Sequence, residues 1–119
     1  MKIGTLAQRT GLSRDTIRFY ERQGLISSQP GDSETNNYRD YPEDLVSQLD
    51  VVTHARAAGM PIAELKKLLA AMDLNSDPTE SLQIIGQQIH DLRTHIDASR
   101  RVIGLLRAAR GQIRKHHTE

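Results

Sequence analysis

The chain has 119 residues, a formal net charge of +1 and aromatic side chains at only 3% of positions. This length fits one small domain plus one long element, with a core built mainly from Leu, Ile, Val and Ala. Because the chain has no cysteine, disulfides, thiolate metal sites and iron–sulfur clusters are excluded. No apolar stretch follows Lys2 or approaches the roughly 18 residues of a membrane helix, so we expect no membrane association and a cytoplasmic location.

The first 26 residues predict a helix-turn-helix. Residues 3–9 place Ile3, Leu6 and Ala7 on one helical face, and residues 10–12, which include a glycine, break the pattern. Ser13 suits the N-cap of a second helix that runs to about Gln23. Two short helices joined by a tight turn containing glycine are typical of this motif. Basic side chains outnumber acidic ones here, which favours contacts to phosphates.

Residues 27–41 are rich in Ser, Pro, Gly, Asp and Asn, which predicts a loop with a tight turn. The short segments 25–26 and 38–41 on either side could pair as two strands. We therefore expect a small β-hairpin, the wing of a winged helix-turn-helix.

Two further helices complete the first domain. Pro42 suits the first position of a third helix that ends at Gly59, and Pro61 opens a fourth. The polar residues that follow indicate a linker. We therefore expect a mainly α-helical chain: a winged helix-turn-helix DNA-binding domain with two supporting helices over residues 1–74, a linker over residues 75–77, and one long helix over residues 78–115.

The long helix carries the clearest periodic pattern. Asp77 can cap it, Pro78 fits its first position, and apolar side chains recur at intervals of three and four residues. We call this stripe the seam; its residues are Leu82, Ile85, Ile89, Leu92, Ile96, Ile103, Leu106 and Ile113. About 36 helical residues extend some 54 Å, too far for a small domain to cover. The seam therefore predicts a coiled coil with a second copy of the chain, the alternative being that it packs only on the N-terminal domain.

Three arginines define the outer face of the second helix. Arg14, Arg18 and Arg22 recur every four residues and form what we call the recognition ridge, while Ile17 lies on the inner face. Arginine is suited to bidentate contact with guanine edges or phosphates. The alternative is a solvated surface with local ion pairs, but three arginines in register on this helix favour DNA.

Other candidate DNA contacts flank the ridge. Phe19 is either a core residue under the wing or a contact to sugar and phosphate, and Tyr20 faces inward with a hydroxyl that could reach a phosphate. On the wing, Tyr38 and Arg39 could reach the minor groove or the backbone, unless the hairpin is simply exposed. Arg56, near the end of the third helix, is a weaker candidate for a backbone contact.

The sequence resembles the MerR family of winged helix-turn-helix transcription regulators from residue 1 to about residue 113. The resemblance is carried most specifically by Ile17-Arg18-Phe19-Tyr20-Glu21 and by Tyr38-Arg39-Asp40-Tyr41, supported by Thr10-Gly11-Leu12-Ser13, Gly24-Leu25 and Ala57-Ala58-Gly59-Met60. It implies a homodimer held by an antiparallel coiled coil. It also implies binding to a pseudo-palindromic operator in double-stranded promoter DNA, which the protein distorts to align the promoter for RNA polymerase. The DNA contacts implied by position are Arg18, Phe19, Tyr20, Tyr38, Arg39 and Arg56.

The chain departs from that pattern at its sensing end. It lacks the cysteines of the metal-sensing members. Because the sequence ends soon after the dimer helix, we expect no large C-terminal drug-binding domain of the kind that other members have. His116 and His117 could bind a metal ion but are better explained as part of a frayed end, and His90 and His95 are poorly spaced for a shared metal. We therefore predict no cofactor and no metal site.

The sequence favours one of three functional classes. A DNA-binding transcription regulator explains the ridge, the wing and the seam together. A protein-interaction adaptor with the same fold is the alternative, favoured only by Asp32 and Glu34 in the wing region. An enzyme is not expected, because the sequence contains no phosphate-binding loop and no nucleophile motif.

Overall fold

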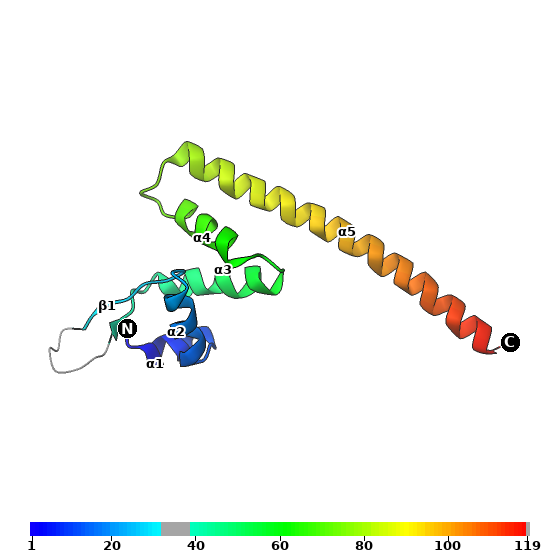
Figure 1. Ribbon diagram of the computed structural model, residues 1–119, viewed down its shortest axis with the longest axis horizontal. Helices are drawn as coiled ribbons and strands as arrows, with labels where there is room; N and C mark the ends of the chain where they lie inside the picture. Colours follow the sequence, from blue (N-terminus) through cyan, green and yellow to red (C-terminus); the bar gives the residue numbers. More distant parts are fainter. Residues whose placement is uncertain (32–38, 119) are drawn as a thin grey trace. The chain divides into compact units, whose positions relative to one another are not determined.

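The computed structural model describes residues 1–31 and 39–118, which form two compact units. The first unit spans Met1–Ser76 and the second begins at Asp77. In chain order the elements are α1 (Ile3–Thr10), α2 (Arg14–Arg22), β1 (Gln29–Pro30), β2 (Arg39–Asp40), α3 (Leu45–Ala57), α4 (Ile62–Ala71) and α5 (Pro78–Thr118), shown in Figure 1. The expected mainly α-helical fold with a small two-stranded hairpin and a long C-terminal helix is confirmed.

The core of the first unit lies where α1, α2, α3 and α4 meet. Within it, α1 packs against α2 and α3, and α3 packs against α4. Its side chains are aliphatic, as the low aromatic content requires, and the fully buried ones are Leu6, Ile17, Leu49, Val52 and Leu65. Each helix of the unit contributes at least one of these residues, so a single cluster fixes all four helices.

The first strand differs from our prediction. β1 is Gln29–Pro30 and pairs antiparallel with β2, Gln29 opposite Asp40 and Pro30 opposite Arg39, whereas we expected residues 25–26 to form this strand. Leu25 instead completes the end of α2, because its N–H donates to the Tyr20 carbonyl over 3.0 Å. Together with Gly24, which has a φ of 79° and donates to Glu21, this is a Schellman motif.

The same cap explains why Leu25 and Ile26 are core residues. In a Schellman motif the residue after the left-handed glycine turns back against the helix, and Leu25 and the following Ile26 are both buried. The end of α3 repeats the device: Gly59 has a φ of 89°, and Met60 donates to the Ala55 carbonyl and is buried. Two glycines therefore return the chain to the core.

The start of α3 also differs from our prediction. We expected Pro42 at its first position, but the helix begins at Leu45. Residues 42–44 form a preceding turn in which Leu45 donates to the Pro42 carbonyl and Val46 to that of Glu43, both over 3.2 Å. These three-residue steps are tighter than α-helical bonds, which places the regular helix three residues later.

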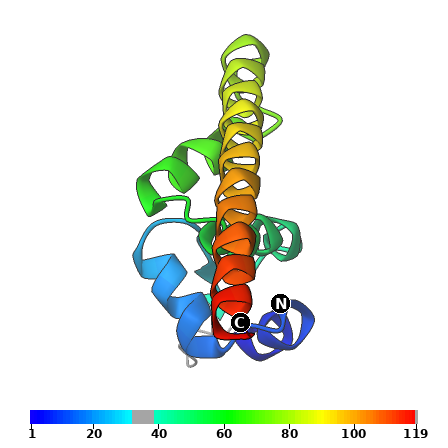
Figure 2. The same cartoon turned by 90° about the vertical axis from the view of Figure 1, so that its right-hand side faces the viewer.

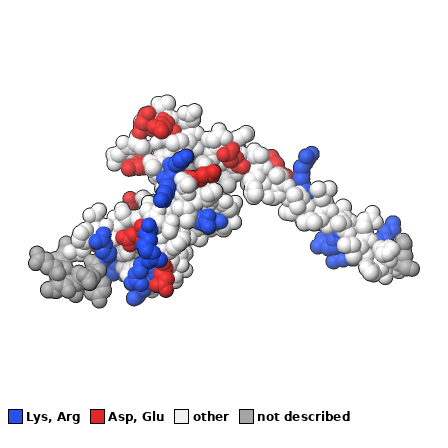
Figure 3. All heavy atoms as spheres, in the orientation of Figure 1, with Lys and Arg blue, Asp and Glu red and all other residues white. Residues whose placement is uncertain are grey.

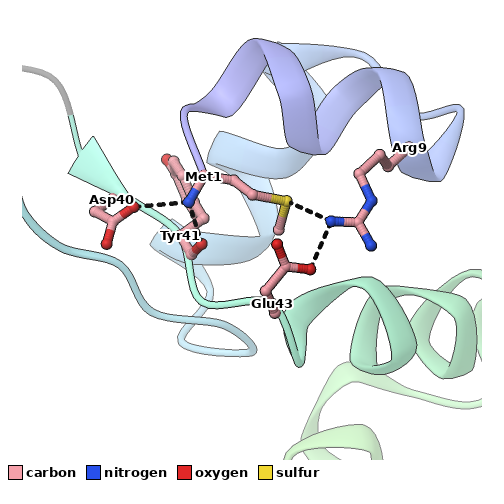
Figure 4. Close-up of polar contacts among 5 residues, drawn as sticks. All are labelled: Met1, Arg9, Asp40, Tyr41 and Glu43. Carbon is pink, nitrogen blue, oxygen red and sulfur yellow. Dashed lines mark hydrogen bonds and ion pairs between the residues drawn. The ribbon is translucent and has the colours of Figure 1, made fainter.

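The N-terminal residue ties α1 to the segment that follows β2 (Figure 4). The α-ammonium of Met1 lies 2.7 Å from Asp40 Oδ1 and donates to the Tyr41 carbonyl over 2.8 Å. The Tyr41 N–H donates in return to the Met1 carbonyl over 2.7 Å. Nearby, Arg9 pairs with Glu43 over 2.6 Å. These contacts hold β2 and the start of α3 against the first helix.

The second unit is α5, one unbroken helix in both views (Figures 1 and 2). Its start follows the prediction: Pro78 is its first residue, and the Asp77 carboxylate accepts from the Thr79 N–H over 3.2 Å. Its 41 residues correspond to about 62 Å of helix. Among the described residues, no helix is long and apolar enough to cross a membrane.

Candidate nucleic-acid interface

The turn between α1 and α2 sets the position of the second helix. Gly11 ends α1 in the left-handed conformation, with a φ of 74°, and its N–H donates to the Ala7 carbonyl. Ser13 then caps α2, its hydroxyl accepting from the Thr16 N–H over 3.1 Å. With Ile17 fully buried, the opposite face of α2 must point away from the core.

That outer face carries the predicted ridge. Arg14, Arg18 and Arg22 are all exposed, as is Phe19, whereas Tyr20 is half-buried. Phe19 is 40% exposed and its ring lies 5.7 Å from that of Tyr20, centroid to centroid. The core alternative for Phe19 is therefore wrong. Its exposed ring on the outer flank of α2 fits a contact outside the protein.

The three ridge arginines have different surroundings. Arg14 leans over α1, where its guanidinium would lie 2.7 Å from a Cβ at Gly4, so a larger residue at position 4 would displace the end of the Arg14 side chain. Arg18 pairs with Asp15 over 3.5 Å at an exposed position. Such a pair contributes at most about 1 kcal/mol, so a phosphate or a base can replace it. Arg22 has no ion pair within the described part of the chain.

A polar network joins the end of α2 to the base of the hairpin. The two carboxylate oxygens of Glu21 accept hydrogen bonds from the hydroxyls of Tyr41, over 2.8 Å, and of Ser28. Arg39 in β2 donates from Nε to the Ser28 hydroxyl over 2.8 Å and from its terminal nitrogen to the Ser28 carbonyl over 3.0 Å. Glu21 thereby fixes the hairpin relative to the recognition helix.

Sequence reasoning missed this network. The sequence predicts only that Glu21 lies near the recognition ridge, that Tyr41 belongs to the second strand and that Ser28 lies in a loop. One signal was present: an acidic residue at the end of a basic helix followed by an arginine in the expected wing. Arg39 was expected to face DNA, and its bonds to Ser28 occupy two of its nitrogens; its contact with DNA stays a prediction.

The remaining predicted DNA contacts lie elsewhere in the first unit or outside the described residues. Arg56 spans the turn after α3 and donates to the Met60 carbonyl over 2.9 Å, so its phosphate contact also stays a prediction. Tyr38 lies outside the described residues, as do Asp32 and Glu34, on which the adaptor alternative depends. In the described ranges, no group of three or more His, Asp or Glu side chains could hold a metal ion.

The predicted seam lies along α5. Ile85 is half-buried, and the other seam residues are exposed, from 36% for Leu92 to 71% for Leu82. Val102 and Leu105 are also exposed but lie off this stripe. A water-exposed apolar stripe of this length is the feature of the second unit that calls for a partner.

The helix-turn-helix, the hairpin tied to it and the exposed basic face of α2 define a winged helix-turn-helix protein of the DNA-binding class. Residues 1–72 match the family model of the MerR HTH family regulatory protein, and residues 46–109 match the model described as MerR, DNA binding. The chain therefore belongs to the MerR family and is a DNA-binding transcription regulator.

Individual relatives agree with this assignment. The chain is 32% identical over 97 residues to an HTH-type transcriptional regulator ZntR homolog of Haemophilus influenzae, covering 81% of this chain and 70% of that protein. The crystal structure of a putative MerR family transcriptional regulator from Listeria monocytogenes covers 89% of this chain and 80% of its own, with 26% identity and a TM-score of 0.72. The fold is also similar to that in the crystal structure of HiNmlR, described as a MerR family regulator lacking the sensor domain, bound to promoter DNA. The two chains are 23% identical with a TM-score of 0.68, and the match covers 89% of this chain and 85% of that one.

Burial raises the pKa of the Tyr41 hydroxyl above its ordinary value, and the hydrogen bond to Glu21 adds to the rise. The folded state therefore retains this proton at a pH where the unfolded chain releases it. The stabilisation is complete below about pH 10, the pKa of an unperturbed tyrosine, and is lost as the pH rises through the higher pKa of the folded state.

We expect Tyr41→Phe to lower the free energy of unfolding by about 1 kcal/mol at neutral pH, because it removes one hydrogen bond. The variant should also lose less stability than the wild type when the pH is raised above about 10. Urea unfolding at several pH values measures both effects. Tyr20→Phe is the control, since the Tyr20 hydroxyl has no hydrogen bond within residues 1–31 and 39–118; equal losses in the two variants would contradict the role given to the Glu21 network.

Proposed function

We propose that the protein acts as a homodimer that binds a pseudo-palindromic promoter operator and regulates transcription by distorting the DNA. The exposed seam of α5 is the observation that carries this proposal. The seam residues follow a seven-residue repeat with two apolar positions. One position holds Leu82, Ile89, Ile96 and Ile103, and the other holds the remaining seam residues. Such a repeat is what a second helix covers in a coiled coil.

An antiparallel arrangement fits this repeat along its whole length. If the two helices overlap from end to end, Leu82 lies opposite the partner's Ile113 and Ile89 opposite the partner's Leu106. The two polar residues that interrupt the repeat, Ser99 and Arg110, then lie opposite apolar side chains and not opposite each other. Every layer therefore keeps at least one apolar side chain, and a two-fold axis passes near the middle of the seam.

Two copies would present two recognition helices to one duplex. A two-fold symmetric dimer matches an operator with two inverted half-sites. The side chains proposed to contact it are Arg14, Arg18, Phe19, Tyr20, Arg22, Tyr38, Arg39 and Arg56. The promoter DNA named for the HiNmlR structure supports this choice of ligand.

Regulation then acts through the shape of the promoter. Bending or untwisting a site of operator length costs on the order of 1–6 kcal/mol, and contacts from the two recognition units of one dimer can supply this energy. The Glu21 network contributes by holding the hairpin at a fixed place beside α2. RNA polymerase takes part indirectly, by binding a promoter whose two elements the distortion has aligned.

Arg18→Ala should weaken binding to an operator by about 1–3 kcal/mol if Arg18 contacts a base edge. The operator is obtained by selecting duplexes from a random library with the protein itself, and affinity is measured by fluorescence anisotropy. Arg18→Lys is the matched control: it keeps the charge and hence the affinity for random duplex, but loses the bidentate geometry. Unchanged operator affinity in the alanine variant would remove Arg18 from the interface.

Combining Ile89→Glu with Ile96→Glu should abolish dimerisation, because four buried carboxylates would then lie near the centre of the seam. Sedimentation equilibrium of the full chain measures the outcome. The control combines Ala98→Glu with Leu105→Glu, which adds the same charge to the same helix outside the seam and should leave the dimer intact. A dimer that survives the seam substitutions would refute this interface.

A further inference from the structure

A second set of arginines lies on α5, outside the recognition unit. Arg93, Arg100, Arg107 and Arg114, which we call the flank arginines, recur every seven residues. Seven residues are nearly two helical turns, so the four side chains share one flank of the helix over about 32 Å. Arg93, Arg100 and Arg107 each follow a seam residue by four positions, and Arg114 continues the same repeat, so the row borders the seam without belonging to it.

These charges are exposed and not neutralised within the chain. All four flank arginines are exposed, and none takes part in an ion pair within the ranges that the structure describes. From Ala98 through Thr118 the helix has no acidic residue, while its basic residues are Arg100, Arg101, Arg107, Arg110, Arg114 and Lys115. Figure 3 shows blue but no red side chains toward the C-terminal end of α5.

The proposed dimer would concentrate this charge. In an antiparallel pair of identical helices, each flank of one helix faces the same flank of its partner. The flank arginines of both copies therefore line one side of the coiled coil. Like charges at such positions oppose pairing, whereas coiled coils commonly place opposite charges beside the seam. A helix dimer that carries eight such arginines along one flank gains stability when a polyanion binds there.

We propose that this flank of the α5 coiled coil is a second DNA-binding surface, which contacts the phosphate backbone of double-stranded DNA without reading its sequence. The inference rests on the proposed dimer. Arginine, not lysine, supplies all four positions, and its planar guanidinium suits bidentate contact with phosphate. A seven-residue repeat spaces the charges about 10 Å apart, a regular row that suits a charged polymer better than a single small anion. The protein is already a DNA-binding regulator, so duplex DNA is the polyanion in its vicinity.

The test uses the full-length protein and a long duplex of random sequence, with the affinity measured over a range of salt concentrations. Arg100→Gln combined with Arg107→Gln removes two flank charges per protomer. Arg101→Gln combined with Lys115→Gln is the matched control, because it removes the same charge from the same part of α5 away from that flank. Glutamine is a good helix former, so both variants keep the helix.

Each lost phosphate contact lowers the slope of log affinity against log salt by about 0.9. We expect the flank variant to lower the slope by about 2–4, and the control by less than about 1. Equal slopes in the two variants would overturn the proposal. So would a flank variant whose slope on DNA is unchanged but which alone loses binding to phosphatidylserine vesicles, because the flank would then bind a lipid surface and not DNA. Sedimentation of the same samples distinguishes failure of this proposal from failure of the proposed dimer. A wild-type protein that sediments as a monomer refutes the dimer, whereas a dimer with equal slopes in the two variants refutes only the second DNA-binding surface.

Discussion

The apolar stripe of α5 is the constraint from which the organisation of this regulator follows. A helix of 41 residues that carries exposed Leu and Ile at regular intervals is unfavourable in water by itself. Covering one such side chain contributes about 1.5–3 kcal/mol, and a second copy of the same helix can cover all of them. In the proposed dimer, this interaction holds two recognition units together, and the symmetry of the operator follows from the symmetry of the coiled coil.

The first unit meets a different requirement, which is to hold one short helix rigidly with few aromatic side chains. Its aliphatic core fixes one face of α2 through Ile17. Glycines after α2 and α3 turn Leu25 and Met60 back into that core. Glu21 then connects the end of α2 to Ser28 and, through Tyr41, to the segment after the hairpin. The core, the glycine turns and the Glu21 network therefore fix the position of the helix from which the exposed arginines extend.

The elements with a strong local signal could be predicted from the sequence. The Ser13 cap fixes the start of α2, and Asp77 and Pro78 fix the start of α5, because capping depends on residues adjacent in the chain. The hairpin could not be placed correctly. Strands of two residues have no measurable alternation, and the apolar pair 25–26, which looked like a strand, is taken up by the cap of α2.

The directions of the arginine side chains could not be predicted either. The helical repeat placed Arg14, Arg18 and Arg22 on one face, but residues outside that repeat decide where some of the guanidinium groups lie. Arg14 uses the space left by Gly4, and Arg39 is drawn to Ser28. Local periodicity contains no information about such partners, so the face of a site is more predictable than the contacts of its members.

Distances between spin labels show directly whether two copies of α5 pair in the antiparallel direction. Because the chain has no cysteine, Gln83→Cys and Ala98→Cys each provide a single labelling site outside the seam. In an antiparallel dimer the two labels at position 83 lie toward opposite ends of the paired helices. From a rise of 1.5 Å per residue we expect them to be about 44 Å apart. Labels at position 98, near the two-fold axis, should be separated by about 10–20 Å, given helix axes 8–10 Å apart. Short separations at both positions would mean parallel helices, and no dipolar coupling at either position would mean no dimer; either result would refute the antiparallel α5 dimer.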